Sequence, residues 1–120
     1  MKERNLLGGL IRFHILYHAS HGPIFGLGII EELGRHGYKL SAGTIYPILH
    51  GMQKEGLLAS EEMLIGGRNR RTYIATDQGV EVLANAKTKV WELFRELFEE
   101  ELQFRRTTHT ATKKAAKNKH

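Results

Sequence analysis

Apolar residues recur with helical spacing in three segments of the first half of the chain. Residues 4–19 place apolar side chains three or four positions apart, which predicts an amphipathic helix. Residues 25–35 and 42–55 show the same spacing and predict two shorter helices. The buried positions expected on these two helices are Leu27, Ile30 and Leu33, and Ile45, Leu49 and Met52.

Pro47 complicates the third predicted helix. If Ser41 is the N-cap, the proline lies too deep and the carbonyl of Gly43 loses a backbone hydrogen bond. If Thr44 is the N-cap, Pro47 falls at the third helical position, where its missing N–H needs no partner. We favour the second arrangement, with residues 41–43 as a turn or an irregular first turn.

The second half of the chain predicts a hairpin and one more helix. Gly56 is suited to end the third helix, and residues 57–65 and 71–76 predict two strands joined by a turn over residues 66–69. Thr76 then offers an N-cap for a long helix over residues 77–104. The expected fold is mainly α with a small β-hairpin, namely a winged helix-turn-helix followed by a long C-terminal helix.

Composition narrows the class of protein. The chain has 120 residues, 18 Lys and Arg, 13 Asp and Glu, a formal net charge of +5 and no Cys. The lack of Cys excludes disulfides, thiolate metal sites and a cysteine nucleophile. No apolar run approaches the roughly 20 residues of a membrane span and no secretory signal is recognised, so we expect a soluble, cytoplasmic protein. A Gly-rich phosphate loop and paired carboxylates are also missing, so we do not expect an enzyme.

Charge is distributed unevenly along the chain. Residues 105–120 carry six Lys and Arg and no acidic residue, so the rest of the chain is close to neutral. Within that rest, residues 35–75 have a net charge of +3 and residues 76–104 of −4. We expect the tail to be disordered, and it either adds sequence-independent affinity for DNA or only solubilises the chain.

Three separated motifs resemble the PadR family of transcriptional regulators over about residues 5–104. SAGTIYPIL at residues 41–49, followed by GLL at 56–58, resembles the recognition helix of that family. GRNRRTY at residues 67–73 resembles its wing, and GPIFGL at 22–27 resembles the start of its second helix. The resemblance implies a winged helix-turn-helix domain over residues 1–76 and a dimerisation helix over residues 77–104.

Double-stranded DNA is the partner that this resemblance implies, and the residue types agree with it. Hydroxyl groups at the start of a recognition helix reach base edges, whereas basic side chains on a wing contact phosphates or a neighbouring groove. The candidate DNA-binding residues are Lys39, Ser41, Gly43, Thr44, Tyr46, Pro47, Lys54, Arg68, Asn69, Arg70 and Arg71. Arg71 and Tyr73 have an alternative role in bracing the wing. The alternative for the whole chain is a winged-helix module that binds protein instead of DNA.

The last predicted helix carries more apolar residues than one buried face needs, which favours a second partner. PadR-like proteins dimerise through this helix and the first one, so the resemblance implies a homodimer, and we expect a repressor of a near-palindromic operator. The candidate dimerisation residues are Leu6, Leu10, Val90, Trp91, Phe94, Leu97 and Phe98. Trp91 and Phe94 are also a hypothetical site for a small aromatic or apolar effector, with ordinary interface packing as the alternative.

His14, His18 and His21 follow one another at intervals of four and three residues, so they can share a helix face. A pair of histidines four residues apart can bind zinc. Without Cys or a nearby acidic residue the set of ligands is too small, so we expect surface or dimer-interface histidines, no metal and no cofactor.

Overall fold

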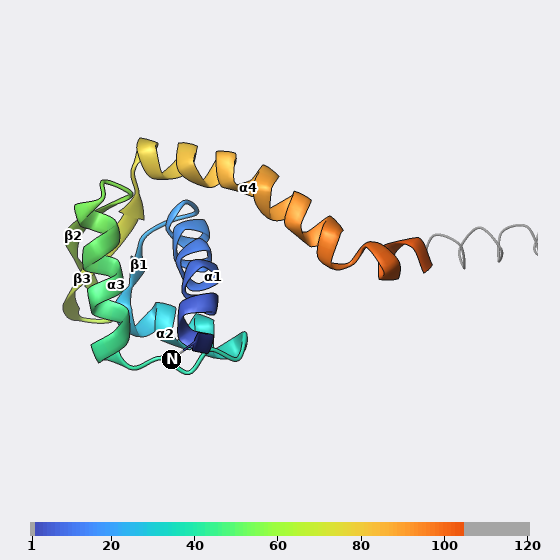
Figure 1. The fold of residues 1–120 in the computed structure, drawn as a ribbon. Helices are drawn as coiled ribbons and strands as arrows, with labels where there is room; N and C mark the ends of the chain where they lie inside the picture. The colour runs from blue at the N-terminus through green and yellow to red at the C-terminus, as the bar shows by residue number, and fades with distance from the viewer. Residues whose placement is uncertain (1, 105–120) are drawn as a thin grey trace, which may run out of the picture. The chain divides into compact units, whose positions relative to one another are not determined.

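The computed structural model describes residues 2–104, and their side chains from Leu7 onward. The chain forms a mainly helical fold with one small antiparallel sheet (Figure 1). The elements, in order, are α1 (Lys2–Ala19), β1 (Ile24–Phe25), α2 (Gly26–Arg35), α3 (Ala42–Lys54), β2 (Leu58–Ile65), β3 (Arg68–Ala75) and α4 (Asp77–Leu97). This is the predicted winged-helix order. The basic tail, residues 105–120, lies outside the described residues.

The chain divides into two compact units between Ala84 and Asn85. The first unit contains the three N-terminal helices, the sheet and the first two turns of α4. The second contains the remainder of α4. Among residues 2–104, no helix is both long and apolar enough to cross a membrane.

The core of the first unit is built from side chains of α1, α2, α3, β2 and β3. Its fully or nearly fully buried apolar residues are Ile11, Ile15, Leu16, Ala19, Ile29, Leu33, Ile45, Leu49, Met52, Leu58 and Tyr73. The expected buried stripe of α2 was partly wrong, because Leu27 is half exposed and Ile29 is buried in its place. Ile29 and Leu33 are one helical turn apart and share a face, whereas a repeat of three residues drifts around the helix.

The start of α3 corrects our favoured arrangement around Pro47. Ser41 occupies the N-cap position, and its carbonyl accepts hydrogen bonds from the N–H groups of Thr44 and Ile45, both at 3.0 Å. Residues 42–43 are therefore the first turn of the helix, and Pro47 lies inside α3. The apolar stripe of α3 is completely buried, and this packing outweighs the one backbone hydrogen bond that the proline removes.

Two glycines end helices in the same way. Gly37 and Gly56 adopt left-handed φ angles of 88° and 83° after α2 and α3. The next residue then donates its N–H back to the last full turn, from Tyr38 to the Leu33 carbonyl (3.0 Å) in α2. The corresponding bond of α3 joins the N–H of Leu57 to the carbonyl of Met52 (2.9 Å). These bonds fix the direction in which the chain leaves each helix.

The sheet has the strand order β1-β3-β2, with both pairs antiparallel. The sequence did not predict β1, a two-residue strand in which Ile24 pairs with Tyr73. The hairpin turn is shorter than expected, because Gly66 and Gly67 both have positive φ (61° and 79°) and close it alone. Strand pairing therefore begins at Arg68 instead of residue 71.

Thr76 caps α4, as predicted. Its hydroxyl accepts a hydrogen bond from the N–H of Gly79 (3.0 Å) and donates one to the carbonyl of Gly56 (2.6 Å). The N–H of Thr76 also binds the carbonyl of Leu57 (3.0 Å). The predicted helix over residues 77–104 is interrupted at Phe98, after which residues 99–104 are helical again, and nothing in the structure explains the interruption.

The first turn of α4 has room only for glycine at position 79. A Cβ there would lie 2.2 Å from the carbonyl oxygen of Leu57, an atom held in place by Thr76. We therefore expect Gly79→Ala to lower the free energy of unfolding by about 2 kcal/mol or more through overpacking. Urea denaturation at a fixed protein concentration measures this.

Gly51→Ala is the matched control, because a Cβ at this position in α3 meets no atom within 4 Å. It should raise the free energy of unfolding by about 0.5–1 kcal/mol through helix propensity. Equal stability of the two variants would show that α4 does not start against Leu57 as described.

Candidate DNA-binding surface

One side of α3 is buried in the core and the other is exposed. Ile45, Leu49 and Met52 face the core, and β2 packs beside the helix (Figure 1). The exposed candidate residues on and before α3 are Lys39, Ser41, Gly43, Tyr46, Pro47 and Lys54, whereas Thr44 is half-buried. The buried stripe thus turns most of the predicted DNA-binding residues of α3 toward solvent.

The exposed start of α3 offers both hydroxyls and backbone donors. Ser41 does not cap the helix with its side chain, and its Oγ lies instead 3.3 Å from Oγ1 of Thr44. The N–H groups of Ala42 and Gly43 precede the first intrahelical donor, so they are directed out of the helix end. A helix start with free N–H groups is suited to a phosphate, and the two hydroxyls are suited to base edges.

Tyr46 has a structural role that the sequence did not reveal. A Cβ on Gly26 would lie 2.5 Å from Cζ and Oη of Tyr46, so the end of the tyrosine ring rests on the first residue of α2. The residue is still 38% exposed. Tyr46 therefore holds α2 against α3 in addition to its candidate contact with DNA.

The arginines of the hairpin differ in how firmly they are held. Arg68 and Asn69 are exposed next to the turn. Arg70 is half-buried, with its guanidinium carbon 4.9 Å from the centre of the Phe25 ring, a cation–π contact. On the opposite face of the hairpin, Nη1 of Arg71 donates to Oγ of Ser60 across the strands (3.2 Å). The sequence indicated a bracing role for Arg71, and the structure gives one to Arg70 as well.

Tyr73 anchors the hairpin in the core, in keeping with its predicted bracing role. Its side chain is completely buried and pairs across the sheet with Ile24 and Ser60. Burial raises the pKa of its phenol, while nearby Arg71 lowers it and Tyr46 raises it. The phenol is therefore neutral, and the root of the wing is fixed to the helices.

A shallow basic hollow lies where the end of α3 meets the hairpin. It has a volume of about 440 Å³ and is lined by His50, Gly51, Gln53, Lys54 and Arg71. Lys54 and Arg71 were candidates, but His50 was not. The spacing of four residues between His50 and Lys54 on one helix is the signal that identifies it. Three basic side chains around one hollow are suited to hold a phosphate group.

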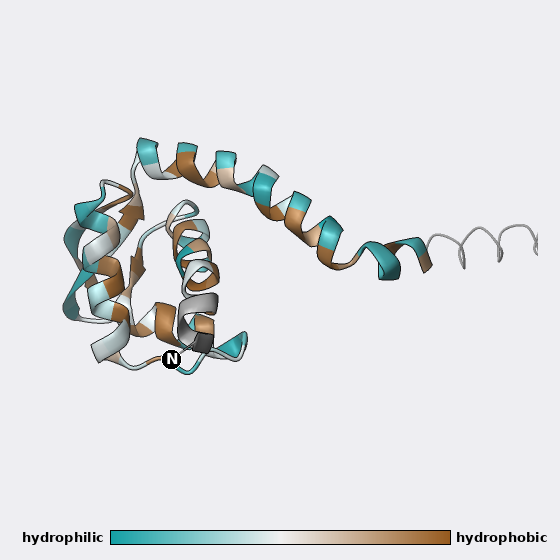
Figure 2. Ribbon diagram, in the orientation of Figure 1, coloured by the Kyte–Doolittle hydropathy of each residue, from teal (hydrophilic) through white to brown (hydrophobic). Residues whose placement is uncertain are grey.

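The candidate dimerisation residues on α4 are exposed within the second unit. Val90, Trp91, Phe94, Leu97 and Phe98 are 40–64% exposed. The rings of Trp91 and Phe94 stack with centroids 5.5 Å apart, and brown, apolar positions recur along α4 in Figure 2. On α1, Leu10 is 45% exposed, whereas the side chain of Leu6 lies outside the described residues.

Of the three histidines that the sequence places on one helix face, His21 lies apart from His14 and His18. The Nδ1–H of His21 donates to the carbonyl of Tyr17 (2.7 Å), and its ring packs against the ring of that residue. His36, at the end of α2, instead joins His14 and His18. The sequence missed His36 because only the packing of α2 against α1 brings it there.

Known proteins resemble this chain in both sequence and fold. The sequence profile of the PadR-like family of transcriptional regulators matches residues 15–85. The transcriptional regulator Rv3488 of Mycobacterium tuberculosis is 44% identical over 87 residues, which cover 72% of this chain and 81% of that protein.

Two solved structures have the same arrangement. A PadR-like regulator from Bacillus cereus is 33% identical, with a TM-score of 0.71 over 82% of this chain and 97% of that one. A PadR family regulator from Eggerthella lenta is 28% identical, with a TM-score of 0.66 over 82% of this chain and 86% of that one. With this profile and these relatives, the chain belongs to the PadR-like family of transcriptional regulators, and is a DNA-binding regulator.

Proposed function

We propose that the chain is a dimeric repressor that binds a near-palindromic operator. The observation that carries this proposal is the exposed side of α3, which presents a polar start at one end and the basic hollow shared with the hairpin at the other. A helix of this kind fits the major groove, with its first turns at the base edges.

The residues divide into two roles in this proposal. Ser41, Thr44 and Tyr46 contact base edges through their hydroxyl groups. Gly43 allows the backbone to come close to the DNA. Lys54, with His50 and Arg71 around the hollow, binds the sugar-phosphate backbone and sets the orientation of α3. We assign peripheral contacts with the sugar-phosphate backbone of the DNA to five further residues, Lys39, Pro47, Arg68, Asn69 and Arg70.

A second copy of the chain is the partner proposed for α4. Four large apolar side chains exposed on the last turns of α4, with Phe98 directly after it, favour association, because leaving them in water is unfavourable. Two recognition helices in a dimer would meet half-sites about 34–36 Å apart, or one turn of DNA.

The stacked pair of Trp91 and Phe94 supports a further part of the proposal. In the proposed dimer these stacked rings would line an apolar cavity at the interface, and their flat faces suit a small aromatic ligand. We assign to this pair a small aromatic or apolar effector, which releases the operator by changing the separation of the two α3 helices.

Replacing Thr44 by Ala removes a hydroxyl from the start of α3 without changing a buried apolar residue. We expect Thr44→Ala to weaken binding to the operator by about tenfold and to leave binding to unrelated DNA unchanged. Electrophoretic mobility shift on both DNAs measures the ratio.

Tyr46 needs two variants because it also packs on Gly26. Tyr46→Phe keeps the ring and tests the hydroxyl, whereas Tyr46→Ala also loosens α2 from α3. Unchanged operator binding by both Thr44→Ala and Tyr46→Phe would contradict the assignment of α3.

We expect Lys54→Ala to weaken binding to every DNA sequence to the same extent. The lost phosphate contact lowers affinity for operator and unrelated DNA by the same factor and reduces the slope of log K against log salt by about 1. Fluorescence anisotropy at several salt concentrations gives both numbers. A loss confined to the operator would instead make Lys54 a base-reading residue.

Leu97→Glu places a charge among the exposed apolar side chains of α4. We expect this variant to be a monomer by analytical ultracentrifugation and to bind the operator at least tenfold more weakly, because a single head makes half of the contacts. Asn85→Glu is the control, since Asn85 is exposed and lies at least about 120° around the helix axis from each of the five candidate dimerisation residues from Val90 to Phe98. A dimer that persists in Leu97→Glu, or is lost in both variants, would contradict the proposed interface.

A further inference from the structure

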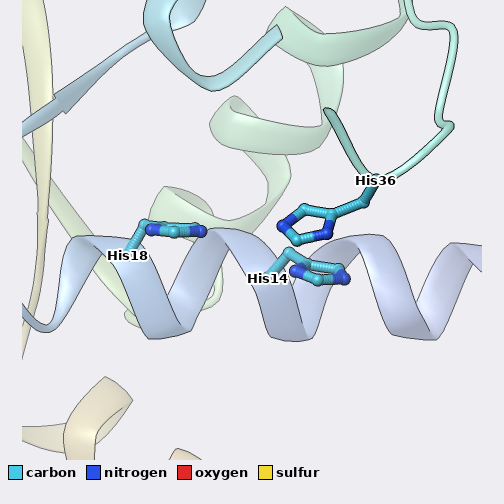
Figure 3. A group of neighbouring side chains, drawn as sticks. All are labelled: His14, His18 and His36. Atoms are coloured by element: carbon cyan, nitrogen blue, oxygen red, sulfur yellow. The ribbon is translucent and has the colours of Figure 1, made fainter. Parts of the chain in front are cut away.

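Three histidines from two helices converge on one small volume of the first unit. His14 and His18 lie one turn apart on α1, and His36 is the C-cap residue that follows α2. The nitrogen atoms that each can offer to a metal lie within 4.8 Å of one another. Figure 3 shows the ring of His18 pointing along α1 toward the rings of the other two.

An acidic side chain stands beside this group. Oε1 of Glu32 lies 3.7 Å from Nε2 of His18 and 3.7 Å from Nε2 of His36. Glu32 also pairs with Arg35 through its second carboxylate oxygen, so Oε1 is the atom directed at the histidines. The expectation of no metal depended on a shortage of ligands, and Glu32 and His36 remove that shortage.

The imidazoles must reorient to bind a cation. Zn–N bonds of about 2.0–2.1 Å place two ligand atoms of a tetrahedral site about 3.4 Å apart, so ligand atoms that now lie within 4.8 Å of one another must draw together by up to about 1.4 Å. Rotation about the side-chain torsions allows this movement, because no hydrogen bond among the side chains of residues 7–104 holds any of the three imidazoles, and Oε1 of Glu32 is 3.7 Å from both His18 and His36. The rings of His14 and His36 now stack, with centroids 4.7 Å apart.

The backbone around these side chains is well fixed. His14 and His18 are on a continuous helix whose neighbouring residues Ile11 and Ile15 are buried in the core. His36 is held by the left-handed Gly37 that follows it and by the hydrogen bond from Tyr38 to Leu33. A ligand set on rigid elements loses little conformational freedom when a cation binds.

We propose that His14, His18 and His36, together with Glu32, bind a divalent transition-metal cation, and that zinc is the best match. Imidazole nitrogen and carboxylate oxygen are ligands that zinc accepts in a four-coordinate site. Nickel, cobalt and copper accept the same ligands, so affinity among them follows their intrinsic order.

The protonation and charge of the four proposed ligands favour the binding of a cation. A metal binds the neutral imidazole, and burial lowers the pKa of His14, as do the neighbouring rings of His36 and His18. Glu32 acts in the opposite direction on that pKa. Its negative charge offsets half of the charge of a divalent cation in the partly buried site.

A bound cation would connect α1 to the end of α2. The segment that follows His36 leads through residues 37–41 directly into α3, so the cation restrains the start of the recognition helix. This consequence depends on the proposed DNA-binding function, whereas the metal site itself does not.

The first experiment measures the metal alone. Untagged full-length protein is treated with a chelator, dialysed and titrated with zinc sulfate and with nickel chloride by isothermal titration calorimetry. We expect one cation per chain, an increase of the melting temperature on zinc binding, and a loss of at least tenfold in affinity for His14→Ala and His36→Ala. Glu32→Gln should weaken binding less than either.

His21→Ala is the matched control, because it removes a histidine from the end of α1 whose ring is turned to Tyr17. It should bind zinc as the parent does. His36 is exposed, so its replacement leaves the core intact, and circular dichroism of each variant verifies folding. The site is wrong if the parent binds less than one cation, or if His36→Ala and His21→Ala bind equally well.

The second experiment adds DNA from upstream of the chain's own gene. A change in its affinity on addition of zinc, seen in the parent and His21→Ala but not in His36→Ala, supports the connection to α3. The same affinity with and without zinc overturns that connection and leaves the metal site standing. Failure to bind this DNA under both conditions would count against the proposed function, whereas the titration without DNA still decides the metal site.

Discussion

The burial of one side of α3 is the constraint on which the proposed mode of action depends. Ile45, Leu49 and Met52 are almost completely excluded from water, so α3 cannot rotate without exposing them. Its polar side is therefore presented to solvent whether or not DNA is bound. The helix tolerates Pro47 for the same reason, because the packing of this stripe, and not a complete ladder of hydrogen bonds, keeps it in place.

Local patterns predicted the helices, the hairpin and the cap at Thr76, since each is determined by residues close together in the sequence. The predictions that failed concern residues whose structure depends on partners far away in the sequence. β1 becomes a strand only through its pairing with Thr72 and Tyr73, and two residues carry no periodic signal. Ile29 replaces Leu27 in the core because the neighbouring elements select the face of α2.

The candidate binding residues show the same division. The hydroxyls of α3 and the arginines of the hairpin are recognisable from sequence, because type and spacing are sufficient. The packing of Tyr46 on Gly26 and the contribution of His50 to the basic hollow depend on where separate elements meet. His36 is the clearest example, since its partners His14 and His18 are on another helix and only the folded chain brings them together.

The short length of β1 determines how the wing can move. β3 is paired on both sides only at Thr72 and Tyr73, and from Arg71 to the turn it has β2 as its single neighbour. The hairpin thus has a stiff base inside the domain and a compliant tip beyond it. In the proposed complex with DNA, Arg68 at the tip would follow the curvature of the sugar-phosphate backbone, while the buried Tyr73 keeps the base of the hairpin fixed to the core.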